Sequence, residues 1–118
     1  MSKRVLIIED DPGLGQTMLE MMGMLGFEAE LVQGVREALA ALKERQDWNA
    51  VVSDFSLGDG KGTEVMRYCI GEEAFVDTYF VITSGYERSE HLAELDGLDK
   101  VEWLVKPYPI ASLVKLIS

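Results

Sequence analysis

The sequence alternates between short apolar runs and segments with helical periodicity, and this alternation constrains the fold more than any other feature. The apolar runs occupy residues 4–9, 27–32, 50–54, 78–84 and 101–105, and the amphipathic segments occupy residues 12–26, 35–46, 62–70, 87–95 and 109–118. Short apolar runs are typical of buried strands, and apolar residues at helical spacing are typical of surface helices. Five strands alternating with five helices predict an α/β domain with a mostly parallel sheet and helices on both faces.

The helical segments differ in the residues that they are expected to bury. In residues 12–26 the spacing predicts one apolar face, made of Leu14, Met18, Met21, Met22 and Leu25. The short segment 87–95 contains the single histidine, His91, for which an exposed helix position is a better explanation than metal binding.

Length and charge limit the classes of function. A chain of 118 residues fits one domain with a real core, so residues 1–118 are predicted to form a single domain. A net charge of -10 argues against direct binding to nucleic acid, because a phosphate backbone requires a basic surface. One cysteine excludes an internal disulfide and favours a cytoplasmic setting. No apolar run reaches the ~20 residues that cross a bilayer, so no contact with the membrane is expected.

Polar residues follow four of the five predicted strands. Acids end the first and third strands, hydroxyls end the fourth, and a lysine follows the fifth: Glu9, Asp10 and Asp11; Asp54; Thr83 and Ser84; Lys106. In open α/β sheets, ligands bind outside the carboxyl ends of the strands. These groups are therefore expected to converge on one edge of the sheet.

Such a set of side chains suits phosphoryl transfer assisted by a divalent cation. Carboxylates at close range repel one another, and a hard cation such as Mg²⁺ relieves that repulsion. The cation and Lys106 would both neutralise charge on a phosphoryl group, and Ser84 could donate a hydrogen bond to it. Asp54 could act as the nucleophile, because carboxylates do form aspartyl phosphates.

Four stretches of the sequence resemble the receiver domain of two-component response regulators, a resemblance that runs from about Lys3 to Leu116. They are "VLIIEDDP", "VVSDFSLGDGKGTE", "FVITSGY" and "WLVKPY". The resemblance implies a CheY-like (βα)5 fold: a flavodoxin-like three-layer sandwich around a doubly wound five-stranded parallel sheet, with strand order 2-1-3-4-5.

The resemblance also implies a metal site and a phosphoacceptor. Glu9 and Asp10 match the acidic pair, and Asp54 matches the acceptor. These three residues and the backbone carbonyl of Ser56 would bind Mg²⁺ or Mn²⁺. Gly62 matches a glycine found where the third helix of the family begins.

Further matches concern the switch. Ser84 is preferred over Thr83 as the switch hydroxyl, because its separation of thirty residues from Asp54 matches the family. Lys106 would pair with the phosphoryl group, and the peptide bond between Lys106 and Pro107 would be cis. Trp103 takes the place of the switch aromatic, which is usually a tyrosine or phenylalanine, and its indole N–H needs a partner if it is buried.

The family mechanism then gives an expected function. A sensor histidine kinase or a histidine phosphotransfer protein would donate a phosphoryl group to Asp54. Ser84 and Trp103 would move in response, and the face made by 87–95, 101–105 and 109–118 would change shape for a downstream protein target or a homodimer. The chain would not be an enzyme beyond its own phosphorylation and dephosphorylation.

Three other functions are weaker explanations of these residues. A phosphorylation-independent scaffold of the same fold does not require the acids or Lys106 and so leaves their presence unexplained. A magnesium-dependent phosphatase of the haloacid dehalogenase type usually has a second aspartate two residues after the nucleophile, where this chain has Ser56. A flavin carrier needs a phosphate-binding loop where Glu9 and Asp10 would repel the anion. The 118 residues contain no output segment, so we expect either a stand-alone regulator or a domain of a larger protein.

Overall fold

The computed structural model describes residues 3–118; the first two residues, which the predicted domain includes, lie outside the described residues. Its central feature is a five-stranded parallel sheet with the order β2-β1-β3-β6-β7. The strands are β1 (Arg4–Ile8), β2 (Glu28–Val32), β3 (Ala50–Asp54), β6 (Tyr79–Ser84) and β7 (Val101–Val105). The predicted order of the second, first, third, fourth and fifth strands is confirmed.

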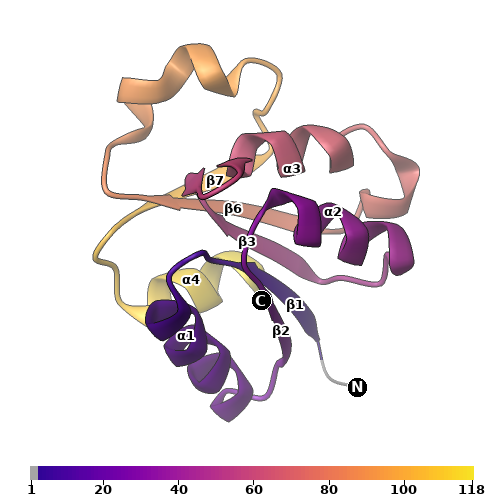
Figure 1. The fold of residues 1–118 in the computed structure, drawn as a ribbon, viewed down its shortest axis with the longest axis vertical. Coiled ribbons are helices and arrows are strands. Elements are labelled where there is room, and N and C mark those ends of the chain that lie inside the picture. The colour runs from indigo at the N-terminus through magenta and orange to yellow at the C-terminus, as the bar shows by residue number, and fades with distance from the viewer. Residues whose placement is uncertain (1–2) are drawn as a thin grey trace.

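Helices cover both faces of the sheet and complete three layers (Figure 1). On one face lie α1 (Pro12–Met24) and α4 (Ile110–Ile117), and on the other lie α2 (Val35–Glu44) and α3 (Gly62–Cys69). Two 3-10 segments, η1 (Glu73–Phe75) and η2 (Arg88–Leu95), precede β6 and β7. The α/β domain with helices on both faces, expected from the alternation, is confirmed, and so is the doubly wound three-layer sandwich that the resemblance implied.

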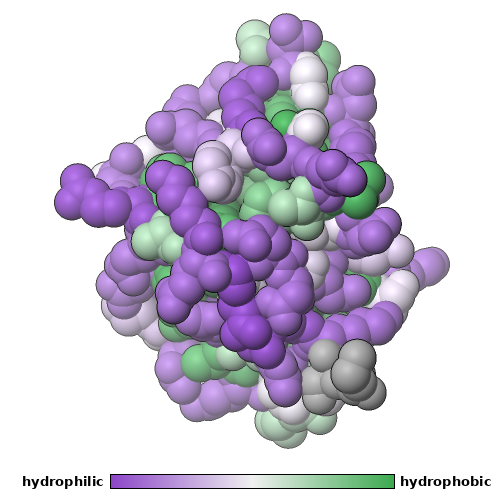
Figure 2. Space-filling view, turned by 90° about the vertical axis from the view of Figure 1, so that its right-hand side faces the viewer, coloured by the Kyte–Doolittle hydropathy of each residue, from purple (hydrophilic) through white to green (hydrophobic). Residues whose placement is uncertain are grey.

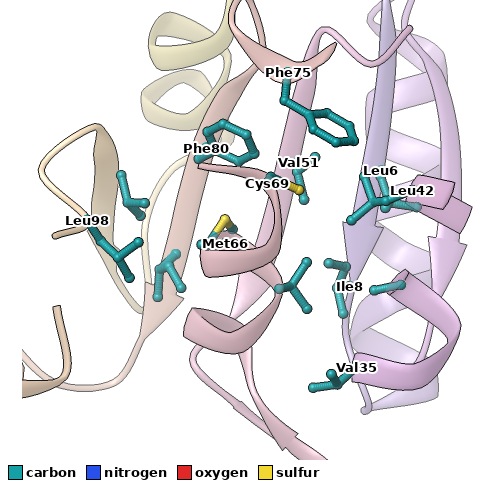
Figure 3. Close-up of a cluster of buried hydrophobic side chains, with 14 of the residues drawn as sticks. Leu6, Ile8, Val35, Leu42, Val51, Met66, Cys69, Phe75, Phe80 and Leu98 are labelled. Carbon is teal, nitrogen blue, oxygen red and sulfur yellow. The ribbon is translucent and has the colours of Figure 1, made fainter. Parts of the chain in front are cut away.

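Two apolar clusters hold the layers together, one on each face of the sheet. The larger lies under α2 and α3, where Figure 3 shows Leu6, Val51 and Phe80 of the sheet facing Leu42 and Met66 of the helices. The smaller lies under α1 and α4. Alternate residues of each central strand enter opposite clusters, which explains why these strands are apolar along their whole length. The strand ends are thereby fixed in place by packing.

The apolar face predicted for the first helix is partly wrong. The buried residues of α1 are Gly15, Met18 and Met22, whereas Leu14 and Leu25 are 40% and 52% exposed. α1 approaches the sheet closely at Gly15, where an added Cβ would lie 2.9 Å from a methyl group of Leu31. This contact rotates the buried stripe away from Leu14, which instead lines an apolar groove between α1 and the segment before α4.

The fourth predicted helix, residues 87–95, is not an α-helix. It forms the 3-10 segment η2, which is interrupted at His91 by non-helical backbone angles (φ -129°, ψ 24°). Only Leu95 in this segment is buried, so no apolar stripe is present to stabilise a regular helix. Polar anchors hold it instead: the Arg67 guanidinium of α3 donates hydrogen bonds to the carbonyls of Glu94 (2.8 Å) and Asp96 (2.7 Å).

The segment after β3 contains a small antiparallel hairpin that the sequence did not predict. Its strands are β4 (Ser56–Leu57) and β5 (Gly60–Lys61). Between them, the carboxylate of Asp59 accepts hydrogen bonds from the backbone N–H groups of Val35 (2.8 Å) and Arg36 (3.1 Å). Asp59 therefore caps the start of α2 from a distant part of the chain.

The surface of the described chain is mostly polar on the face drawn in Figure 2, where apolar residues appear only in separate patches. Within residues 3–118, none of the helices combines the length and the hydropathy that a transmembrane span requires.

Candidate acidic site at the carboxyl edge of the sheet

The ends of β1, β3 and β7 bring three charged side chains into direct contact. The Lys106 ammonium lies 3.3 Å from Oδ2 of Asp54 and 3.4 Å from Oε1 of Glu9. Asp10 joins them, since one carboxylate oxygen from each of Glu9, Asp10 and Asp54 lies within 4.8 Å of the others. The predicted convergence of strand-end residues is thus what the structure shows for these four side chains.

Burial makes Glu9 the most constrained acid of this cluster. Glu9 is only 3% exposed, and one of its oxygens accepts a hydrogen bond from the backbone N–H of Asp11 (3.2 Å). Loss of water on burial is the main cause that raises the pKa of Glu9 above its usual value, and the negative charge of Asp54 adds to it. Lys106 and the Asp11 N–H oppose this shift but do not reverse it.

The cluster has more negative than positive charge, which favours a bound cation. Three carboxylates face one ammonium, so when all are ionised the group has a net charge of minus two. Carboxylate oxygens at this spacing are the ligands that Mg²⁺ prefers, and an octahedral site leaves room for a carbonyl and water. Glu9, Asp10 and Asp54 therefore fit a divalent cation in both chemistry and geometry.

The third acid of the "EDD" sequence has a different role. Oδ1 of Asp11 accepts hydrogen bonds from the backbone N–H groups of Gly13 (3.0 Å) and Leu14 (3.1 Å) at the start of α1. It is the N-cap of that helix. Capping thus accounts for Asp11, so within the "EDD" sequence only Glu9 and Asp10 join Asp54 in the candidate cation site.

The backbone around Asp54 is held tightly on both sides. Oγ of Ser53 donates to the carbonyl of Asp54 (2.8 Å), and the N–H of Phe55 donates to the carbonyl of Thr83 (2.8 Å). Gly62 packs against the same place, because an added Cβ would lie 2.5 Å from the Asp54 carbonyl oxygen. Only glycine fits at residue 62, which gives a physical reason for the glycine that the motif predicted there.

The two candidate hydroxyls occupy different faces of the sheet. Thr83 pairs with Asp54 in the strand register, and Ser84 comes one residue later, opposite Val105. Both are buried, at 2% and 3% exposed. Oγ of Ser84 accepts a hydrogen bond from the N–H of Tyr86 (3.1 Å). Because Trp103 pairs with the residue two before Ser84, Ser84 and Trp103 share a sheet face.

Trp103 is partly buried and has the hydrogen-bond partner that its indole requires. Its Nε1–H donates to the carbonyl of Tyr86 at 2.8 Å. The peptide groups of Tyr86 are therefore linked to both predicted switch residues, through its N–H to Ser84 and through its carbonyl to Trp103.

The remaining predicted positions lie around the same edge. Ser56 begins the hairpin two residues after Asp54, and the nearby Gly58 passes Asp10 closely enough that an added Cβ would lie 3.9 Å from its carboxylate. The peptide bond between Lys106 and Pro107 is cis, the geometry that the resemblance implied. The Lys106 N–H donates to the carbonyl of Ser84 at 2.7 Å.

Sequence reasoning missed two neighbours of the site. Burial, and then the charges of Glu9 and Asp54, raise the pKa of Tyr108 to about 12, so its hydroxyl stays protonated beside the acids. His91 is not the exposed residue that was predicted: its side chain is only 18% exposed and packs against Phe55. The position of Tyr108 directly after "KP" could have indicated the first, but no sequence signal indicated the second.

Magnesium is expected to stabilise the folded chain, because it would bind the folded cluster and not the separated acids of the unfolded chain. At 100 times its dissociation constant, a ligand adds about 2.7 kcal/mol to the free energy of unfolding. Asp10→Asn should lose most of that gain, since the exposed Asp10 contributes charge to the site without filling the core. Urea unfolding with MgCl₂ or EDTA at equal ionic strength measures both, and an undiminished gain in Asp10→Asn would place the ion elsewhere.

Comparisons with known proteins agree with this geometry. A family model described as "Response regulator receiver domain" matches residues 5–118. The acid tolerance regulatory protein ActR of Sinorhizobium medicae is 30% identical over 89% of this chain and 53% of its own length. The response regulator MprA of Mycolicibacterium vanbaalenii is 31% identical over 97% and 48%. The chain thus spans about half the length of these curated relatives.

A solved structure gives the same result over the whole chain. The CheY-like response regulator receiver domain from Methylobacillus flagellatus has a TM-score of 0.83 and 30% sequence identity, and the alignment covers 100% of both chains.

Proposed function

The chain belongs to the family of response regulator receiver domains, and on that basis we propose that Asp54 accepts a phosphoryl group and that Mg²⁺ (or Mn²⁺) assists the transfer. Phosphorylation-dependent switching in two-component signalling is the general role of this family. The observation that carries the proposal is the contact of Lys106 with both Asp54 and Glu9 at the carboxyl edge of the sheet.

The phosphoryl transfer itself needs little from the protein beyond position and charge. A carboxylate oxygen of Asp54 attacks phosphorus, and the bond from phosphorus to the donor's imidazole nitrogen breaks, leaving a neutral histidine after protonation. Lys106 stays within reach of the transferred oxygens and balances their charge. A bound divalent cation, held by Glu9, Asp10, Asp54 and the Ser56 carbonyl, would neutralise further charge at the same phosphoryl group.

The response to phosphorylation is proposed to pass through Ser84 and Trp103. When the Ser84 hydroxyl turns to the phosphoryl group, its hydrogen bond from the Tyr86 N–H is lost, and the Tyr86 carbonyl that holds the Trp103 indole is disturbed. The indole then moves, and the face made by η2, β7 and α4 changes shape. A downstream protein, or a second copy of the chain, would bind that changed face.

The partners are proposed from the chemistry of the reaction. A sensor histidine kinase or a histidine phosphotransfer protein supplies the phosphoryl group, and a protein target receives the signal. The chain is proposed to act in the cytoplasm, where ATP charges such kinases, and to be no enzyme apart from its own phosphorylation and dephosphorylation. The net charge of -10 supports protein partners over nucleic acid for this domain.

Intact-mass measurement after incubation with acetyl phosphate tests the proposal directly. We expect the wild-type chain to gain the mass of one phosphoryl group with MgCl₂ and to gain almost none with EDTA. Incubation with a phosphorylated histidine phosphotransfer protein provides the same test with a protein donor. No gain from either donor would reject phosphorylation and would favour a scaffold role for this fold.

A further inference from the structure

Four aromatic rings meet beside the acidic site, and His91 touches the other three. The centroid of its ring lies 4.3 Å from that of Phe55, 5.7 Å from that of Trp103 and 5.8 Å from that of Tyr86. The rings of His91 and Trp103 are close to parallel, at 30°. Phe55 directly follows Asp54, and its ring centroid also lies 5.5 Å from that of Trp103. His91 therefore packs against a direct contact between the acceptor segment and the predicted switch aromatic.

A chain of polar contacts fixes the histidine ring in this place. Nδ1 of His91 lies 3.0 Å from Oε1 of Glu94, and Oε2 of Glu94 lies 2.5 Å from the Lys61 ammonium. Lys61 belongs to the hairpin after Asp54 and also lies over the Phe55 ring, 5.4 Å from its centroid. Hydrogen bonds from Lys61 and His91 lower the pKa of Glu94, which keeps this carboxylate charged.

Packing alone is a poor explanation for a histidine here. Its Nε2 atom is buried and has no hydrogen-bond partner among the described residues. An unsatisfied buried polar atom destabilises a fold, and an apolar ring of similar size would avoid that cost. The backbone of η2 also departs from helical angles at His91 itself. The imidazole is instead suited to a position that needs both a flat ring toward Trp103 and a polar atom toward Glu94.

We propose that His91 is a positioning residue of the switch, whose ring holds the Trp103 indole in the position seen here. The contacts from His91 through Glu94 to Lys61 connect the position of Trp103 to the hairpin that follows Asp54. The signalling role of His91 rests on the proposed function. Because His91 stabilises the unphosphorylated arrangement, removing it lowers the free energy needed to move Trp103 and favours the phosphorylated state.

Fluorine NMR of protein containing 5-fluorotryptophan tests the inference without any phosphodonor. The chain has two tryptophans, and Trp103→Phe identifies the resonance of Trp103. In His91→Ala we expect this resonance to shift, while that of the buried Trp48 stays in place. His91→Phe, which keeps a flat ring but has no atom to contact Glu94, should return the Trp103 resonance only part of the way to its wild-type position. Leu92→Ala is the matched control, because Leu92 is 62% exposed in the same segment.

Two further readouts make the test decisive. Glu94→Ala removes the partly exposed carboxylate that contacts Nδ1 of His91. It should shift the Trp103 resonance in the same direction as His91→Ala does, but by less. His91→Ala should also be phosphorylated by acetyl phosphate faster than wild type, on the order of two- to tenfold, the factor expected for the loss of one aromatic contact. A Trp103 resonance at the wild-type position in both His91→Ala and Glu94→Ala overturns the inference. A wild type that takes no phosphoryl group contradicts only the proposed function.

Discussion

Asp54→Asn is expected to reduce the phosphoryl gain from acetyl phosphate to background. The amide keeps the shape of the side chain beside Lys106, but it has neither the negative charge nor the nucleophilic oxygen that attacks phosphorus. The variant should also bind Mg²⁺ more weakly, since one of the three clustered carboxylates is lost. Intact mass measures the first effect, and the shift of the urea midpoint on adding MgCl₂ measures the second.

Asp59→Asn is the matched control for that experiment. Asp59 lies in the same loop, but its carboxylate accepts hydrogen bonds from the start of α2, and an asparagine can still accept one of them. We expect this variant to be phosphorylated as well as wild type. A normal gain in Asp54→Asn, or its loss in Asp59→Asn alone, would mean that the acceptor is a different carboxylate.

Gly62→Ala is expected to destabilise the fold and to slow phosphorylation together. The new methyl group would lie 2.5 Å from the Asp54 carbonyl oxygen, 2.6 Å from Oγ of Ser53 and 3.1 Å from Ile82. Two of these contacts are closer than packed atoms tolerate, so the backbone that carries Asp54 must shift. Overpacking of this kind lowers the free energy of unfolding by about 1–3 kcal/mol. Urea unfolding and the rate of mass gain measure the two effects.

Gly23→Ala is the control for Gly62→Ala. Gly23 lies in α1 with no atom within 4 Å of an added Cβ, so the same substitution meets open space. Alanine favours a helix interior over glycine by roughly 0.8–1.0 kcal/mol, so this variant should be slightly more stable than wild type. Equal stability for both variants would show that Gly62 is not confined in the way its neighbours indicate.

The sheet and the acidic cluster could be predicted because both follow from strong local rules. Strands buried on two faces are apolar along their length, and the carboxyl ends of parallel strands meet at one edge. Glu9, Asp54 and Lys106 lie more than forty residues apart in the sequence, yet each follows a strand whose carboxyl end lies at the same edge of the sheet. The roles given to Ser84 and Trp103 within that site remain predictions.

The departures from prediction arise where contacts between elements override local pattern. Helical spacing predicted that Leu14 is buried, but α1 contacts the sheet at Gly15 and leaves Leu14 exposed. Residues 87–95 have helical spacing but bury only one side chain, so polar anchors from Arg67 determined their shape. His91 could not be placed from sequence because its neighbours Phe55, in the bend after β3, and Trp103, in β7, are distant from it in the chain.

The cap that Asp59 provides for α2 couples two parts of the chain that the sequence separates by more than twenty residues. When the loop after Asp54 opens, the N–H groups of Val35 and Arg36 must lose their hydrogen bonds to Asp59 and become exposed to water. Amide hydrogen exchange at these two residues of α2 would thus report opening of the loop that follows Asp54. Exchange in the first turn of α2 would therefore report how often the loop after Asp54 opens.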